Sequence, residues 1–152
     1  MIVLTRVDHR LLHGQVAFSW TSHLSANCIL VANDAASSDQ TKKTIIKLGK
    51  PSGVKLVIKN IDNSIKAINS GVTDKYNLFI VVETIDAAYK LIKGVDAIKE
   101  LNLGGTKFEE GKESLSSAVF VTPDEKKELD DLVSDGIKVY TQQVPTDKKK
   151  DI

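Results

Sequence analysis

The stretch Asp8-His9-Arg10-Leu11-Leu12-His13-Gly14-Gln15-Val16 joins two segments of different character, and the rest of the chain is arranged around this junction. The segment Ile2–Val7, which opens with the apolar run Ile2-Val3-Leu4, precedes it and predicts a buried strand. The apolar residues from Val16 to Leu24 follow it at spacings compatible with a helix. The polar residues therefore lie in a strand-to-helix loop, which in open α/β sheets borders the crevice where ligands bind.

This loop offers an acid, a fixed positive charge and an imidazole followed by glycine. Glycine lets the backbone approach a ligand closely, and the start of a helix presents free N–H groups at its positive end. These groups suit an anion carried by, or bound near, His13. Residue chemistry alone leaves two interpretations: a phosphate or phosphohistidine site, or a structural loop in which Asp8 and Arg10 pair and His13 caps the helix.

The composition is typical of one soluble globular domain. A chain of 152 residues that is 41% apolar and 27% charged can bury a core without disulfides or metals. The net charge of +1 gives no indication of a nucleic-acid or membrane-surface partner. The single cysteine, Cys28, lies in an apolar run and is typical of core packing in a reducing compartment. With neither a signal peptide nor an apolar run of membrane-spanning length, we expect a cytoplasmic protein.

Apolar, β-rich runs alternate with amphipathic segments along the whole chain. The expected strands are Ile2–Val7, Cys28–Asn33, Val54–Lys59, Asn77–Val82, Ala97–Leu103, Ala118–Val121 and Ile137–Gln142. The expected helices are Gly14–Leu24, Asp39–Leu48, Ile61–Ser70, Thr84–Lys93 and Pro123–Ser134. This alternation predicts a single α/β domain over residues 1–152, with an open, mostly parallel sheet and helices on both faces.

Several shorter features carry their own expectations. Asn33-Asp34 and Thr84 each follow a strand and favour an Asx turn and a helix cap, with a ligand contact as the alternative. Lys93-Gly94 predicts a helix end with a glycine cap. The polar segment Gly104–Ser117 predicts a loop or short irregular hairpin, either a solvated connection or a cover over the site. The charged tail Asp147–Asp151 is expected to fray.

The central motif resembles the active-site signature of the IIB subunits of the mannose/sorbose family of the bacterial sugar phosphotransferase system. That signature reads Asp-x-Arg-Leu-Ile/Leu-His-Gly-Gln-Val, with a tryptophan a few residues on, here Trp20. The likeness continues, in order, through Val31-Ala32-Asn33-Asp34, Pro51-x-Gly53-Val54-Lys55, Leu101-Asn102-Leu103-Gly104-Gly105 and Gln143-Val144-Pro145. It covers nearly the whole chain and implies a sheet of about seven strands with an antiparallel edge.

The resemblance implies a phosphoryl carrier. His13 would accept a phosphoryl group from a histidine of a IIA domain and pass it to a primary hydroxyl of a sugar held by the membrane IIC/IID subunits, without cofactor or metal. Arg10 would clamp the phosphate, and Asp8 would orient Arg10 or an imidazole N–H. Gly14 and Gln15 would supply backbone N–H groups. The activity would be that of a protein-N(pi)-phosphohistidine–sugar phosphotransferase.

Two other function classes remain as alternatives. The first is a binding module of the same fold, in which a degenerate site senses the phosphorylation state of a partner. The second is a phosphohydrolase, which is disfavoured because no second histidine or carboxylate is placed to activate water. A metal pair of His9 and His13 is disfavoured by the loop and by the lack of a third ligand. The sugar, the phosphorylated imidazole nitrogen and any homo-oligomer stay open.

Overall fold

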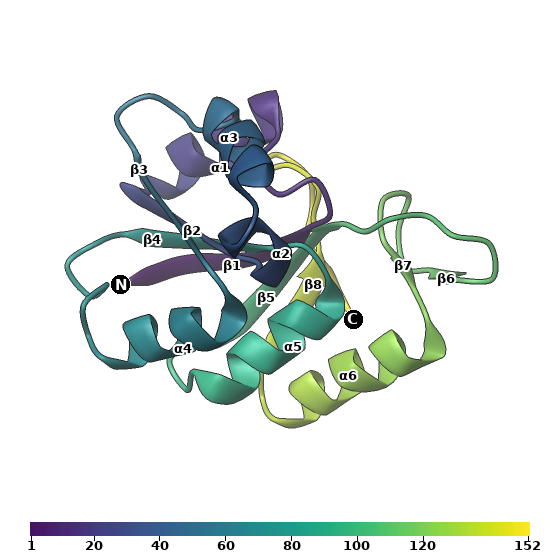
Figure 1. Cartoon of the computed structure of the whole chain (residues 1–152). Helices are drawn as coiled ribbons and strands as arrows, with labels where there is room; N and C mark the ends of the chain where they lie inside the picture. The colour runs from purple at the N-terminus through teal and green to yellow at the C-terminus, as the bar shows by residue number, and fades with distance from the viewer.

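Two layers of helices enclose a seven-stranded sheet in the computed structural model, which describes all 152 residues (Figure 1). The strand order is β3-β2-β4-β1-β5-β8-β9. Neighbouring strands are parallel except at the β9 edge, where β9 runs antiparallel to β8. The bounds are β1 Ile2–Asp8, β2 Cys28–Ala32, β3 Lys55–Lys59, β4 Leu78–Val82, β5 Glu100–Gly105, β8 Lys138–Thr141 and β9 Lys150–Asp151. The predicted mostly parallel α/β sheet with an antiparallel edge is confirmed.

Helices cover both faces of this sheet, as predicted. One face packs against α1 (Gly14–Leu24), α2 (Asp34–Ser37) and α3 (Gln40–Leu48), and the other against α4 (Ile61–Asn69), α5 (Ile85–Gly94) and α6 (Pro123–Ser134). The strands divide their side chains between two apolar cores: in β4, Phe79 faces one core and Ile80 the other. Strands β2 and β4 are buried along their whole length because both faces are covered. None of the six helices combines the length and the apolar character that a membrane-spanning helix needs.

Local capping explains where most helices begin. The Thr84 hydroxyl accepts a hydrogen bond from the backbone N–H of Ala87, so the predicted cap of α5 is confirmed. Thr122 and Glu125 form a reciprocal capping box at the start of α6. The Asn33 side chain accepts a hydrogen bond from the backbone N–H of Ala36 and caps α2. A short helix of four residues thus stands where the sequence predicted an Asx turn.

The predicted role of Gly94 as a helix-ending cap is wrong. Gly94 is the last residue of α5, and its φ is not positive. The cap residue is Val95, which has an extended backbone. A Cβ atom at Gly94 would lie 2.6 Å from Cδ1 of Ile65. Glycine is therefore needed here because α4 packs closely against the end of α5.

The seventh strand is not the one the sequence predicted. The Ala118–Val121 segment contributes β7 (Phe120–Val121), which pairs with β6 (Glu113–Ser114) in a separate two-stranded sheet. The charged tail, predicted to fray, instead supplies β9. The Gln142 amide donates to the carbonyls of Pro145 and Asp147, and these bonds fold the chain back so that Tyr140 pairs with Asp151. The prediction failed because backbone pairing, not charge, decides whether this tail is ordered.

The contact between α5 and α6 brings carboxyl groups together and gives a pH-dependent term in stability. Burial and a hydrogen bond with Asp86 raise the pKa of Glu128 to about 7. The negative charge of Glu125 also raises this pKa, and the positive charge of Lys90 lowers it. Between the ordinary value of 4.5 and about 7, the folded protein holds a proton that the unfolded chain releases. The free energy of unfolding should therefore fall as pH rises through this window.

Glu128→Gln should remove this decline, leaving stability unchanged at pH 4 and raised at pH 8. Because Glu128 is only partly buried, solvent screening should keep the gain on the order of 0.5 kcal/mol. Urea unfolding curves of parent and variant at pH 4, 6 and 8 measure the difference. A variant that loses stability at pH 8 would contradict the assignment.

Candidate functional site

The predicted loop lies at the carboxyl end of β1, a central strand flanked by β4 and β5. Two backbone hydrogen bonds fix the start of the loop: the N–H of Leu11 donates to the carbonyl of Asp8 at 2.9 Å, and that of His9 to the carbonyl of Gly105 at 3.0 Å. Leu11 has φ +58° and Gly14 has φ +45°. A leucine in the left-handed region is strained, and such strain persists only where surrounding contacts over-determine the backbone.

Asp8 organises the loop from beneath. Its carboxylate is buried, and Oδ1 accepts hydrogen bonds from the backbone N–H of Arg10 at 3.0 Å and from its Nε at 3.5 Å. The Nη groups of Arg10 make no hydrogen bond, and the side chain is about one-third exposed. The predicted contact between Asp8 and Arg10 is confirmed. The imidazole closest to Asp8 is that of His9, with Nδ1 4.0 Å from Oδ1, and not that of His13.

A second arginine, which the sequence analysis missed, stands behind Asp8. Arg6 is only 2% exposed, and its Nη2 donates to Asp8 Oδ2 at 3.2 Å. The other donors bond Oδ1 of Asn102 and the carbonyls of Gln142 and Gln143. Arg6 and Arg10 are the only arginines in the chain. A lone charge in a predicted buried strand was the signal that could have identified Arg6, since such charges are almost never buried unpaired.

Arg6 also connects the loop to α1 and to the segment after β8. Its guanidinium carbon lies 5.0 Å from the ring centroid of Trp20, whose Nε1–H donates to the carbonyl of Gln143 at 3.0 Å. Trp20 is buried and belongs to the apolar core on the α1 face of the sheet. Burial lowers the pKa of the Arg6 guanidinium, and the Asp8 carboxylate acts in the opposite direction.

His13 occupies the N-cap position of α1, and its side chain is exposed. Its imidazole makes no capping hydrogen bond, so the predicted alternative of a capping side chain is wrong. The N–H groups of Gly14 and Gln15 precede the first intrahelical bonds, which reach the carbonyl of His13 from Val16 and Ala17. No acidic residue lies in the first turn. The imidazole and two backbone donors are thus available at the positive end of one helix.

A polar hollow of about 200 Å³ lies beside this loop. It is lined by His9 after β1, by residues after β4, by the start of α6 and by the segment after β5: His9, Glu83, Thr84, Thr106, Lys107, Glu109, Lys112 and Glu125. Thr106 binds both the N–H and the carbonyl of Phe120, which holds this segment as the predicted irregular hairpin. The segment is therefore a wall next to the site. No group of three His, Cys, Asp or Glu side chains could hold a metal ion.

The chain matches the family model described as PTS system sorbose subfamily IIB component over residues 2–152. It is 32% identical over 152 residues to the N-acetylgalactosamine-specific phosphotransferase enzyme IIB component 1 of Escherichia coli (strain K12), across 99% of this chain and 96% of that protein. It is 29% identical over 149 residues to the PTS system mannose-specific EIIAB component of the same strain, across 98% of this chain and 46% of that protein. The crystal structure of the E. coli N-acetylgalactosamine-specific IIB component 1 superimposes with a TM-score of 0.93 at 31% identity, covering 100% of this chain and 99% of that one.

Proposed function

Because the chain belongs to the sorbose subfamily of phosphotransferase-system IIB components, which transfer phosphoryl groups during sugar uptake, we propose that His13 is its phosphoryl-carrying residue. The observation that carries the proposal is the exposed imidazole of His13, without a capping bond, beside the unused N–H groups of Gly14 and Gln15. The other two histidines have different surroundings. His9 lies next to Asp8, and His23 packs edge-on against Trp20 near the far end of α1.

The transfer onto His13 is a substitution at phosphorus. A neutral imidazole nitrogen of His13 attacks in line, the P–N bond to the donor imidazole breaks, and the donor nitrogen keeps the electron pair. The Nη groups of Arg10, with the N–H groups of Gly14 and Gln15, stabilise charge on the phosphoryl oxygens. In the second step a sugar hydroxyl oxygen attacks phosphorus, the P–N bond to His13 breaks, and the released imidazole nitrogen takes up the hydroxyl proton.

The donor set fits a carrier that must release its cargo. One arginine and two backbone N–H groups bind a phosphoryl group less tightly than a lysine, a metal and a glycine-rich loop would together. Asp8 acts indirectly, because it holds both the backbone and Nε of Arg10. Arg6 in turn holds Asp8. We therefore assign Arg10 to the phosphate and Asp8 and Arg6 to positioning.

The partners follow from the family. The phosphoryl donor is a IIA domain, an assignment supported by the mannose-specific EIIAB relative, which is named for both components and is about twice as long as this chain. The acceptor is a sugar held by membrane IIC/IID subunits, so we place the protein at the cytoplasmic face of the membrane. Relatives named for N-acetylgalactosamine and for mannose are of similar identity, so similarity alone does not name the sugar.

Phosphate incorporation from a phosphorylated IIA domain tests the proposal. Intact mass should rise by one phosphoryl group, the adduct should be labile in acid, and peptide mapping should place it on the peptide that contains His13. No gain with a competent donor would instead support the binding-module alternative. Turnover of a simple phosphomonoester would support a hydrolase.

Arg10→Gln should slow phosphoryl transfer on the order of 100-fold, because one charged donor to the phosphoryl oxygens is removed. Stability should change little, since the side chain is partly exposed and Asp8 keeps its bond from Arg6. Rapid-quench measurement of phosphate transfer gives the rate. Arg10→Lys, which keeps the charge but loses the planar fork, should fall between parent and Arg10→Gln. A rate within threefold of the parent for Arg10→Gln would remove Arg10 from the phosphate site.

A further inference from the structure

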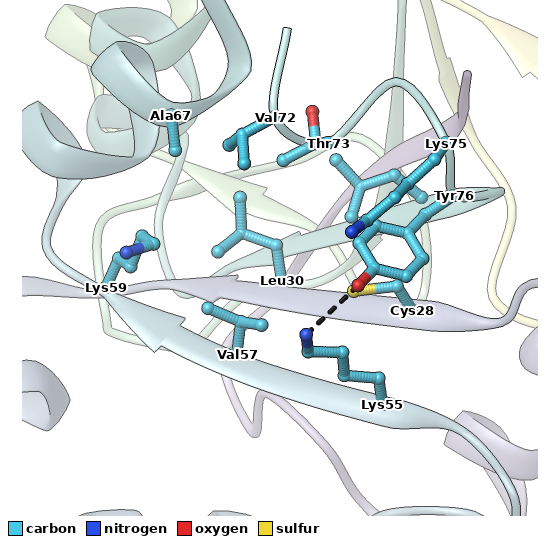
Figure 2. A pocket seen from close by; sticks show the side chains of 11 residues that line it. Cys28, Leu30, Lys55, Val57, Lys59, Ala67, Val72, Thr73, Lys75 and Tyr76 are labelled. Carbon is cyan, nitrogen blue, oxygen red and sulfur yellow. Dashed lines mark hydrogen bonds between the residues drawn. The ribbon is translucent and has the colours of Figure 1, made fainter. Parts of the chain in front are cut away.

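A second hollow lies at the opposite end of the sheet from His13, where β2, β3 and β4 begin (Figure 2). Its volume is about 310 Å³, within the range of small-molecule pockets. Figure 2 shows Leu30 of β2 and Val57 of β3 on one side, with Val72 and Tyr76 of the segment after α4 opposite them. Cys28 also lines this pocket.

The cavity exists because the helical layer stops short of the sheet edge. Strand β3 is the edge strand and is only partly buried, whereas its neighbour β2 is buried throughout. Helix α4 ends at Asn69, and the chain returns to β4 through the turns of residues 70–77. This connection covers the edge without filling the space above Leu30 and Val57.

Lysines provide the charge of the pocket. Three of the eleven lining residues are Lys55, Lys59 and Lys75, none of the eleven is acidic, and none of these lysines forms an ion pair. Lys55 Nζ donates to the Tyr76 hydroxyl at 3.0 Å. The Nζ atoms of Lys55 and Lys75 each lie 5.2 Å from the Tyr76 ring centroid. Two ammonium groups are thus gathered around one aromatic ring that lines an apolar cavity.

We propose that this cavity binds a free small molecule with a short apolar chain and one anionic head, of which a medium-chain carboxylate is the simplest example. The apolar chain would lie against Leu30 and Val57, and the head would meet the ammonium groups beside Tyr76. A concave pocket of this size can enclose a single apolar chain, whereas it does not match the flat surface of a membrane. We therefore assign a dissolved molecule as the ligand. The inference does not depend on the role of His13.

Titration of the full chain with octanoate, followed by amide NMR shifts, tests the proposal. Shifts should saturate with a Kd of about 0.1–1 mM, as expected for so small a ligand, and should centre on residues 28–30, 55–59 and 72–78. Hexanoate should bind roughly fourfold more weakly for each missing methylene. Octanol, which lacks the charge, should bind several-fold more weakly, and octyltrimethylammonium should not bind.

Two variants locate the site. Ala67→Trp fills the cavity from α4 and should abolish the shifts. The double change Lys55→Gln with Lys75→Gln alters only the rim and should weaken octanoate at least fivefold while leaving octanol unchanged. Lys43→Gln, on α3 across the sheet, removes a charge elsewhere and should have no effect. The proposal is overturned if no saturable shifts occur or if octanol binds as well as octanoate. It is also overturned if lipid vesicles shift the amide signals and dissolved octanoate does not, or if the shifts centre on the exposed Phe18, Ile45 and Leu48.

Discussion

His13→Ala should accept no phosphoryl group from a phosphorylated IIA domain, with no mass gain and no acid-labile adduct. The loss should be complete because the variant lacks the nitrogen that attacks phosphorus. The remaining hydrogen-bond donors of the loop can contact a phosphoryl group but cannot form a covalent bond to it. The imidazole is exposed and makes no capping bond, so its removal should leave the thermal unfolding temperature unchanged. A loss of transfer with intact folding would therefore report chemistry and not structure.

The other histidines provide matched controls, because the chain has only three. His23 lies near the far end of α1 and packs against Trp20, so His23→Ala should keep the parental rate of phosphoryl transfer. His9→Ala lies beside Asp8 and should keep full stoichiometry, even if its rate shifts through the altered local charge. Full incorporation into His13→Ala, or none into His9→Ala, would move the carrier role away from His13.

Gly104→Ala should destabilise the fold by about 3 kcal/mol or more, a large loss for one methyl group. A Cβ atom at position 104 would lie 2.0 Å from Cζ of Arg6, far inside contact distance. The guanidinium would have to leave its place over β5, and the buried Asp8 carboxylate would lose its bond from Nη2. Removing one partner of a buried ion pair leaves an uncompensated charge, which is the costly outcome.

Gly105→Ala is the matched control, in the same strand and one residue on. There a Cβ atom would meet nothing closer than His9 Nδ1 at 3.5 Å, an ordinary contact. Its stability should stay within about 1 kcal/mol of the parent, since alanine restricts the unfolded chain more than glycine does. Urea unfolding with tryptophan fluorescence suits the comparison, because the single Trp20 lies against Arg6. Equal stabilities for the two variants would show that Arg6 does not depend on the gap at Gly104.

The helices were predictable where local signals suffice. The bounds predicted for α1 and α6 match the structure, because a glycine with positive φ begins one and a capping threonine with proline begins the other. The strand at β9 was not predictable in this way. Its pairing depends on bonds from Gln142 that turn the chain back, and its own residues are charged. A strand of two residues carries too little hydrophobic pattern to be recognised.

The candidate site shows the same contrast between signals within one segment and contacts between distant segments. The loop of Asp8, Arg10 and His13 could be identified because the residue types stand together in the sequence. Arg6 was missed because its partners are distant: Asn102 is 96 residues away, and the carbonyl of Gln143 is 137 away. The space that Gly104 leaves for Arg6 is likewise a relation between neighbouring strands. Pattern along one segment predicts local structure, whereas contacts between strands require the fold.

The long reach of Arg6 has a consequence for how the protein is made. The loop that contains His13 is synthesised well before Gln142 and Gln143, whose carbonyls hold Arg6. A nascent or truncated chain that ends before these residues has the histidine but leaves Arg6 without these two partners. The support that Arg6 gives to Asp8, and through Asp8 to Arg10, should therefore be complete only after Gln142 and Gln143 have been synthesised and have reached β1.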